Sequence, residues 1–481
     1  MLVLFMISAF LQSTSEVSIP GDIQIGSLLM VHDYLQTSEG TFYTECGTLN
    51  PTETVRSEAY LYSLNYTNQN ILAKKSFKLG LRILDTCTNA YQAIRGTLSL
   101  VANSTTDLCH PNNSFSGGTL VVASALTSGI LQQINYVLQA YCIPIVDSQA
   151  SSTAFNIPDR YPYLLRTVPS DSFQSDAILQ LLKAMHWKRV SVVYENTMYS
   201  VDLKQVFDQL APDSDVCIEK FFELDLEPAE WNKTFAQIKH HLKLAGAPRV
   251  LIVLLRVPRA RVLVEEMLTW DLPARVQLIG SDAWGTELNG HDTILENAIV
   301  PVAAIEPVEA FVEHLRSITL KTASNPWIRQ LIEAQHNCSY SARTCSGLEK
   351  LDMTAGSMSS AGFNARLAFR SIAVIAETLK SLHDRSCAHG TDLCANFFFN
   401  LTGSSLYEEL KKCHYELPID SFHFSNGAGL PQYTFLQYRL SEWIPVADWD
   451  ASAKTLISVE KIRTFVNYSA TVIQLELLFP L

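Results

Sequence analysis

A carboxylate at the end of an apolar stretch is the side chain in this sequence best placed for chemistry. Residues Val276 to Gly280 form a largely apolar, β-type run, and Ser281 and Asp282 follow it directly. In α/β proteins the carboxyl ends of parallel strands open into crevices where ligands bind. There Asp282 could hold a cation such as an amino group. It could equally cap the next helix, which is the commoner role of an isolated aspartate.

No sequence pattern of a common enzyme accompanies this aspartate. The chain has no Gly-x-Ser-x-Gly, no Walker loop, no Gly-x-Gly-x-x-Gly after a strand and no His-Glu-x-x-His. His240 and His241 lie in a polar, amphipathic helical pattern, which is more typical of solvated histidines than of metal ligands. The sequence therefore predicts a binding protein rather than an enzyme, without a metal or other cofactor.

Size and charge narrow the class of protein. The chain has 481 residues, of which 47% are hydrophobic and 17% charged, so it can form two or more domains with large cores. Its net charge is −12 and it has no basic run, which argues against nucleic acid as a partner. It has no apolar stretch of about 18 residues, the length that spans a bilayer.

Several features point to export. The short apolar run from Met1 to Leu11 is typical of a secretory signal peptide, predicted over 1–16; because no basic residue precedes it, an apolar start without a targeting role is the alternative. The ten cysteines fit an oxidising compartment. Two pairs flank short polar loops, a spacing that suits local disulfides better than zinc: Cys338 with Cys345, and Cys387 with Cys394. Seven glycosylation sequons are present, at Asn65, Asn103, Asn112, Asn232, Asn337, Asn400 and Asn467.

The elements that must position Asp282 alternate between two patterns. Strands are predicted over 23–31, 78–85, 119–124, 143–147, 189–194, 249–255 and 276–280. Helices are predicted over 55–64, 91–101, 129–141, 173–186, 201–210, 231–244, 259–268 and 365–383. This alternation predicts an α/β fold with parallel sheets covered by helices on both faces. We expect two such lobes, with the chain passing between them more than once.

An ordered set of motifs runs from Gly21 to Tyr438. They are Gly21–His32, Cys46–Asn50 with Arg56–Ala59, Leu79–Cys87, Arg166–Asp171, His186–Val193, Leu278–Trp284 and Asn325–Trp327, followed by the two cysteine loops. Together they resemble the extracellular Venus-flytrap domain of class C G-protein-coupled receptors, closest to metabotropic glutamate receptors.

The resemblance implies a bilobed, type I periplasmic-binding-protein-like fold with a ligand cleft between two parallel-sheet lobes. Lobe 1 would take 21–165 and 304–440, and lobe 2 would take 166–303 and 441–470. The tail, 471–481, departs from the family. Closure of the cleft would be the signal, because a hinge turns the binding of a small ligand into a large displacement.

The resemblance also assigns a ligand site. The ammonium of an amino acid would meet Asp282 and Tyr199 through a charge-assisted hydrogen bond and cation–π attraction. Its carboxylate would lie at the helix that starts at Ser128. On the next loop, Ser148, Ala150 and Ser151 take the carboxylate-binding positions, with a hydroxyl lost at Ala150, and Asp171 matches an acid of the cleft.

The far end of that site departs from the family. Arg56 matches an arginine that grips acidic groups, whereas Ser405 and Glu287 replace a lysine and an arginine. Glutamate is therefore a doubtful ligand, and a neutral, smaller or basic amino acid, or an amine, fits as well. A packed loop aromatic at Tyr199 and a surface cation at Arg56 are the alternatives without a ligand.

The same resemblance pairs Cys46 with Cys87, and pairs the cysteines within each of the two loops. Cys109 would form an interchain disulfide in a homodimer joined through lobe 1. Cys217 matches a cysteine that bridges to a following cysteine-rich domain, whereas Cys142 and Cys413 receive no partner.

Two functions follow as expectations. The first is the ligand-binding region of a metabotropic-glutamate-like receptor at the extracellular face of the plasma membrane; a G protein would be reached only through a transmembrane region absent from this sequence. The second is a secreted flytrap without a small ligand, acting as a decoy or a dimerising module.

Overall fold

The computed structural model describes residues 16–35, 46–102, 108–109, 118–226, 228–285, 288, 290–303, 306–353, 361–387, 390–399, 401–453, 455–458 and 462–464. Several predicted features lie outside these residues. They are the signal segment up to residue 15, the 471–481 tail, Glu287 and the sequon residues Asn103, Asn112, Asn400 and Asn467.

The first sheet has six strands in the order β1-β5-β2-β6-β7-β8. Their bounds are β1 Glu16–Ile19, β2 Ile23–Leu29, β5 Leu79–Asp85, β6 Thr119–Ala125, β7 Ile145–Asp147 and β8 Leu164–Arg166. All neighbours pair in parallel except β1 with β5. The central strand β6 is buried at every residue, as expected for a parallel strand covered on both faces.

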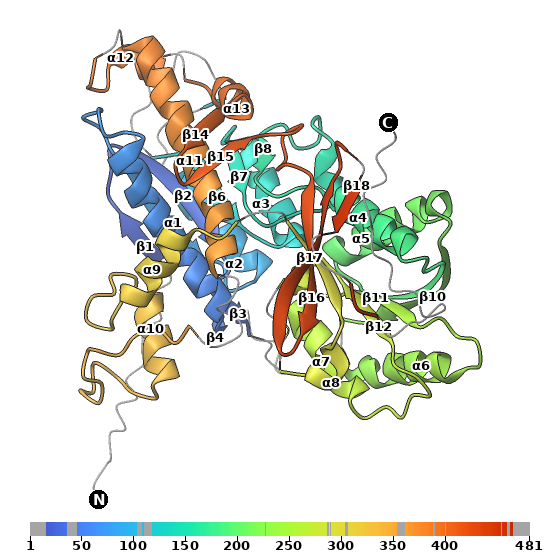
Figure 1. Ribbon diagram of the computed structural model, residues 1–481. Helices are drawn as coiled ribbons and strands as arrows, with labels where there is room; N and C mark the ends of the chain where they lie inside the picture. Colours follow the sequence, from blue (N-terminus) through green and yellow to red (C-terminus); the bar gives the residue numbers. More distant parts are fainter. Residues whose placement is uncertain are drawn as a thin grey trace, which may run out of the picture.

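The helices of this lobe pack around one continuous core. They are α1 Pro51–Asn70, α2 Ala90–Ala102, α3 Ser128–Ala140, α9 Glu309–Ser317, α10 Pro326–Gln335, α11 Ala361–Ser386, α12 Ala395–Phe399 and α13 Gly403–Lys411. Two short hairpins, β3 His32–Tyr34 with β4 Cys46–Leu49 and β14 His414–Leu417 with β15 Asp420–His423, complete it. The long helix α11 lies against α1, far from it in the sequence (Figure 1).

The second sheet has eight strands in the order β10-β9-β11-β12-β13-β16-β17-β18. Their bounds are β9 Arg189–Glu195, β10 Cys217–Leu224, β11 Val250–Leu254, β12 Gln277–Gly280, β13 Ile299–Ala303, β16 Gln432–Arg439, β17 Glu442–Asp450 and β18 Thr455–Ser458. The pairs up to β13 are parallel and those from β13 to β18 are antiparallel.

Helices cover both faces of this second sheet, and each face has its own core. One core takes residues from α4 Asp171–Ala184 and α5 Met198–Leu210, and the other from α6 Trp231–Lys243 and α7 Val257–Met267. The short helix α8 Asp292–Leu295 and the 3-10 turns η1 Thr153–Asn156, η2 Pro212–Ser214, η3 Pro228–Glu230 and η4 Asp282–Trp284 lie in connections. The structure is thus the predicted α/β fold with two largely parallel sheets.

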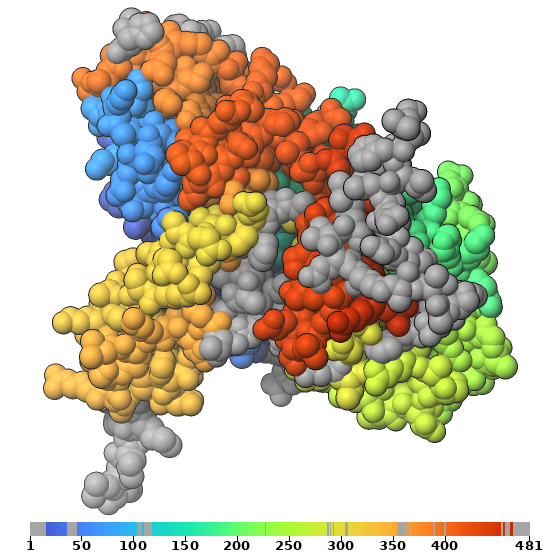
Figure 2. Space-filling view, viewed as in Figure 1, coloured from blue at the N-terminus to red at the C-terminus, as the bar shows by residue number. Residues whose placement is uncertain are grey.

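The chain passes between the two sheets after β8, after β13 and before β16. We therefore call 16–166 with 306–430 the first lobe and 168–303 with 431–464 the second. Each lobe combines segments distant in the sequence, blue with orange in one and green with red in the other (Figure 2). The predicted boundary at 440 is corrected: β16 lies in the second sheet, because it pairs with β13 and β17.

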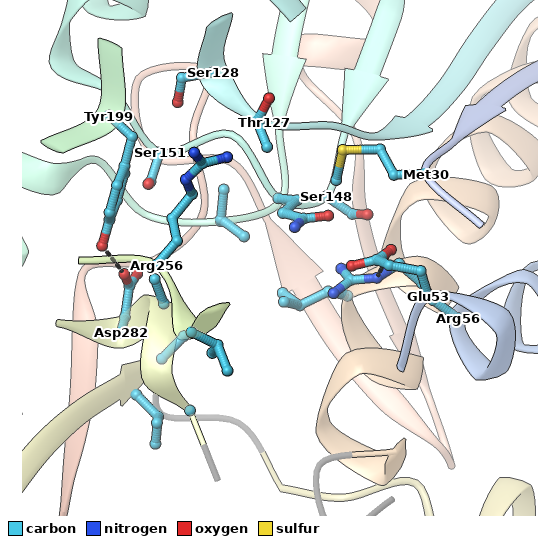
Figure 3. A pocket seen from close by; sticks show the side chains of 18 of the residues that line it. Met30, Glu53, Arg56, Thr127, Ser128, Ser148, Ser151, Tyr199, Arg256 and Asp282 are labelled. Atoms are coloured by element: carbon cyan, nitrogen blue, oxygen red, sulfur yellow. Dashed lines mark hydrogen bonds and ion pairs between the residues drawn. The ribbon is translucent and has the colours of Figure 1, made fainter. Parts of the chain in front are cut away.

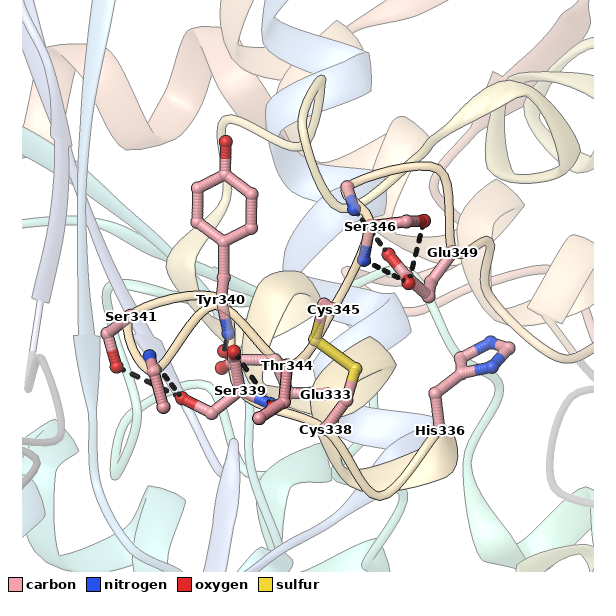
Figure 4. The surroundings of a disulfide bond; sticks show 12 residues. Glu333, His336, Cys338, Ser339, Tyr340, Ser341, Thr344, Cys345, Ser346 and Glu349 are labelled. Carbon is pink, nitrogen blue, oxygen red and sulfur yellow. Dashed lines mark hydrogen bonds between the residues drawn. A yellow bond between two sulfur atoms is a disulfide. The ribbon is translucent and has the colours of Figure 1, made fainter.

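The structure contains the three predicted intrachain disulfides, Cys46–Cys87, Cys338–Cys345 and Cys387–Cys394. In the Cys338–Cys345 loop, Glu333 accepts from the Tyr340 N–H, and the Thr344 hydroxyl accepts from the Ser339 N–H at 2.7 Å (Figure 4). Just beyond it, Glu349 accepts from the N–H groups of Ser346 and Gly347, which lower its pKa to about 2.

The prediction that Cys109 links two protomers is corrected. Cys109 forms a disulfide with Cys142, and their Cα atoms are 5.2 Å apart. Cys142 ends the turn after α3 with φ +54°, and this turn brings it beside residues 108–109. Among the described residues, Cys217 and Cys413 are the free cysteines.

Candidate functional site

A cavity of about 310 Å³ lies between the two lobes, a volume that suits a small ligand. Its first-lobe wall includes Met30, Asp33, Asn50, Glu53, Arg56, Thr88, Ser128, Ser148, Gln149 and Ser151. Its second-lobe wall includes Tyr199, Arg256, Val257, Asp282, Ala283, Val302 and Leu436. Both lobes therefore supply polar and charged groups to one space (Figure 3).

Asp282 and Tyr199 meet on this wall. The Tyr199 hydroxyl donates to Asp282 Oδ1 at 2.6 Å, and the Asp282 N–H donates to Gln174 Oε1 at 3.0 Å. Tyr199 lies in the first turn of α5, whose N-cap Thr197 accepts from the Ser200 N–H. The pair is thus positioned by a helix start and by the turn that follows β12.

The turn at Asp282 depends on its neighbours Gly280 and Trp284. The fully buried Trp284 ring packs over Gly280, where an added Cβ would lie 2.4 Å from Trp284 Cδ2. The Trp284 Nε1–H donates to the Leu255 carbonyl at 3.1 Å. Any side chain at position 280 would therefore displace the Trp284 indole and, with it, the turn that carries the Asp282 carboxylate.

Burial sets the electrostatics of this end of the cavity. It raises the pKa of Asp282, and it raises the pKa of Asp171 well above the ordinary range, with the Asp282 charge adding to the effect on Asp171. Burial and then the Asp282 charge also raise the pKa of Tyr199, so its hydroxyl stays a donor. Within the described part of the chain, no cationic side chain is among the groups that lower the pKa of Asp282, whereas the Arg166 charge partly opposes the rise at Asp171. A cation entering the cavity would relieve this repulsion.

The predicted carboxylate end lies on the first lobe. Ser128 is the first residue of α3, and its Oγ accepts from the Ser152 N–H at 3.4 Å. Ser148 Oγ donates to the Ser124 carbonyl at 3.1 Å and lies 3.0 Å from the Tyr60 hydroxyl. Ser151 lines the same wall. Hydroxyls and a helix start thus face the cavity, a combination that favours an anion.

The structure brings together six predicted site residues on the cavity wall: Asp282, Tyr199, Ser128, Ser148, Ser151 and Arg56. Ala150 and Asp171 are buried behind the wall. Ser405 does not line the cavity; it lies in the first turn of α13, where it forms a capping box with Thr402.

Arg256 is a wall residue that the sequence interpretation missed. It lies two residues after the end of β11, so the argument from strand ends that selected Asp282 could have found it. Its Nε donates to Glu195 Oε1 at 3.0 Å, and Arg259 also bonds to this fully buried Glu195. Burial alone would raise the pKa of Glu195, but the charges of Arg256 and Arg259 hold it below its ordinary value.

Hydrogen bonds join the two lobes beside the serine wall. Asp202, on α5 of the second lobe, accepts from the N–H of Thr153 at 2.6 Å, from its hydroxyl at 2.6 Å and from the Ser152 hydroxyl at 3.0 Å. Asn156 Nδ2 donates to Ser170 Oγ at 2.9 Å. The structure therefore holds the lobes in contact at this side of the cavity.

Among the described residues, none of the helices combines the length and the apolar character needed to cross a membrane. Residues 55–441 match the family model described as "Receptor family ligand binding region".

A metabotropic glutamate receptor of Drosophila melanogaster is 28% identical to this chain over 345 residues, which make up 68% of this chain and 34% of that receptor. The chain thus spans about a third of the length of this curated relative.

Proposed function

Since this chain belongs to the family of receptor ligand-binding regions, we propose that the cavity between its lobes binds an α-amino acid or a related amine outside the cell. The observation that carries this proposal is the Asp282 carboxylate, which lies on the cavity wall with the Tyr199 hydroxyl bonded to it. A carboxylate without a cationic partner in a partly desolvated cavity is a strong site for an ammonium group.

The remaining wall supports the carboxylate of such a ligand. The helix start at Ser128 supplies free N–H groups and a positive dipole end, and Ser151 adds a hydroxyl. Arg256 adds a guanidinium that Glu195 holds in place. The amine and carboxylate sites therefore belong to opposite lobes, apart from Arg256.

A ligand held in this way favours the arrangement in which both walls are within its reach. Its binding shifts the population of lobe arrangements only to the extent that it binds one of them better. The Asp202 bonds to Ser152 and Thr153 stabilise the same arrangement. We propose that closure of the two lobes around the ligand is the signal. In a full-length receptor this signal would reach a G protein through a membrane region.

Calorimetry on the purified chain with a panel of amino acids and amines tests the proposal. We expect at least one binder, with an affinity that Asp282→Ala lowers about a hundredfold, since a buried charge partner is lost. Asp208→Ala, on the exposed side of α5, is the matched control and should bind as the wild type does. An Asp282→Ala affinity equal to that of the wild type would contradict the site.

We also propose a homodimer through the first lobe, now without a covalent link. Four large side chains on the neighbouring helices α2 and α3 and the turn after α3 are exposed, which supports such a contact: Tyr91, Leu98, Tyr136 and Tyr141. Light scattering should give a dimer mass that Tyr91→Lys reduces. A wild-type mass of one chain at high micromolar concentration would refute the dimer.

A further inference from the structure

The two ends of the cavity carry different charge arrangements (Figure 3). Asp282, Tyr199 and Arg256 lie at one end, and Glu53 and Arg56 lie at the other, with Ser148 between them. We call the second group, with its neighbours Asp33, Asn50 and Gln149, the distal end. It faces whatever the ligand carries beyond its amino acid head.

Arg56 is already engaged by an acid of its own helix. Its Nε lies 3.0 Å from Glu53 Oε2, and the two side chains are only 6% and 9% exposed. Burial raises the pKa of Asp147, and the hydrogen bonds to that carboxylate and then the Arg56 charge oppose the rise. A ligand carboxylate that approached Arg56 would therefore approach Glu53 as well.

Asp33 adds a second acid to this end. It lines the cavity and accepts from Asn50 Nδ2 at 3.1 Å. Its charge adds to the rise in the pKa of Glu53 that burial causes. Among the described residues of the distal end, two carboxylates thus face one guanidinium. Burial raises the pKa of Glu53 and the Arg56 charge opposes this, so a second cation beside Glu53 would stabilise its ionised form.

We infer that the distal end selects a positively charged ligand group, as in a basic α-amino acid, over the side-chain carboxylate of glutamate. The inference rests on the proposed function, because it assumes that the amino acid head lies at Asp282. A guanidinium or ammonium there would complete the charge balance of Glu53, Asp33 and Arg56. A carboxylate would add a third negative charge to a desolvated site.

Calorimetry with arginine, lysine, glutamine and glutamate at neutral pH tests this selectivity. We expect arginine or lysine to bind at least about tenfold more tightly than glutamine, and glutamate to bind most weakly. In Glu53→Gln the preference for the basic amino acid over glutamine should fall about tenfold, and glutamate should gain affinity because Arg56 loses its partner. Glu58→Gln is the matched control, a buried residue of the same helix that bonds to His314 outside the cavity; it should keep the wild-type order.

The outcomes separate this inference from the proposed function. Glutamate binding more tightly than arginine and lysine, with an affinity that Asp282→Ala lowers, overturns the inference and leaves the proposed function standing. A basic preference that is unchanged in Glu53→Gln also overturns it. No amino acid binding at all, or binding indifferent to Asp282→Ala, removes the proposed function and the inference with it. If Glu53→Gln does not fold, Asp33→Asn serves instead. In Asp33→Asn the preference for the basic amino acid over glutamine should fall about threefold, a smaller loss because Asp33 is more exposed than Glu53.

Discussion

Two aspartates occupy corresponding places in the two sheets but are used differently. Asp147 ends β7 in the first sheet, and Asp282 follows β12 in the second. Asp147 Oδ1 accepts from the N–H groups of Gln149 and Ala150 at 2.9 and 2.6 Å, and its Oδ2 accepts from the Ser124 hydroxyl at 2.6 Å. Asp282 instead accepts from Tyr199 and presents its carboxylate to the cavity.

The difference lies in what the chain does after the strand. After Asp147 the backbone folds back over the carboxylate and buries it completely, so Asp147 caps the turn that follows β7. At Asp282 the following turn is fixed by Trp284, which packs on Gly280, and Asp282 lines the cavity, so one side of this residue faces open space. Burial raises the pKa of both residues, so desolvation does not distinguish the cap from the proposed anchor; the open side does.

The largest effect that would sharpen this comparison is on ligand affinity. Asp282→Asn should lower the affinity for an amine ligand about a hundredfold, roughly 3 kcal/mol, because the charge partner is lost. The ligand-free protein should not lose stability, since its fold disfavours the charged form. Calorimetry and thermal melts measure the two quantities. A variant that loses stability and keeps affinity would make Asp282 a cap as well.

The reverse pattern is expected at the other aspartate. Asp147→Ala removes the acceptor of two N–H groups and a hydroxyl and should cost about 2–3 kcal/mol of unfolding free energy. Denaturant titration measures this, with the exposed Asp159→Ala as control. Affinity per folded molecule should change far less than in Asp282→Asn, and an equal loss of affinity would break the comparison.

Acidification should act on Asp282 and Asp171 in a predictable direction. Because their pKa values are raised, both take up protons above the ordinary value of 3.8. Amine affinity should fall by up to about tenfold per pH unit below the raised pKa of Asp282. The contribution of these groups to stability has the opposite sign: it is fully present below the unfolded pKa and is lost as pH rises through the folded pKa. Calorimetry from pH 7 downwards checks the first effect, and an amine affinity that is still independent of pH at the ordinary value of 3.8 would show that Asp282 is not the anchor.

The smallest expected effect belongs to the hydroxyl that orients Asp282. Tyr199→Phe should weaken amine binding by about 1 kcal/mol, close to fivefold, while the ring still lines the cavity. Tyr194→Phe is the matched control, because the Tyr194 hydroxyl donates to the exposed carboxylate of Glu223. An equal effect in both variants would remove the special role of Tyr199.

Much of the fold could be predicted because parallel strands are uninterrupted apolar runs. β6 and β11 are fully buried, and their sequences are apolar enough to be recognised. β10 was missed because it is an edge strand whose apolar residues are interrupted by the exposed Glu219, Lys220 and Glu223. β13 and β16 pair although more than a hundred residues separate them in the sequence, and no local pattern predicts such a pairing.

The site was predictable where local chemistry marks it and hidden where the tertiary structure makes it. Asp282 follows a strand, and so does Arg256, which the same argument would have found. Glu53 was missed because the predicted helix began at 55, although the Asn50 cap and Pro51 at the first helical position mark the true start. The partner of Cys109 depended on where α3 ends in space, which spacing alone does not give.

The pairing of β13 with β16 has a consequence for the order in which the protein can be built. β13 is synthesised long before β16, and the residues between them belong to the other lobe. Until about residue 439 has been made, β13 offers an unpaired edge with the apolar residues Ile299 and Val300, the kind of edge to which other chains add. The second lobe therefore finishes folding last, although most of its sequence is synthesised before the first lobe is complete.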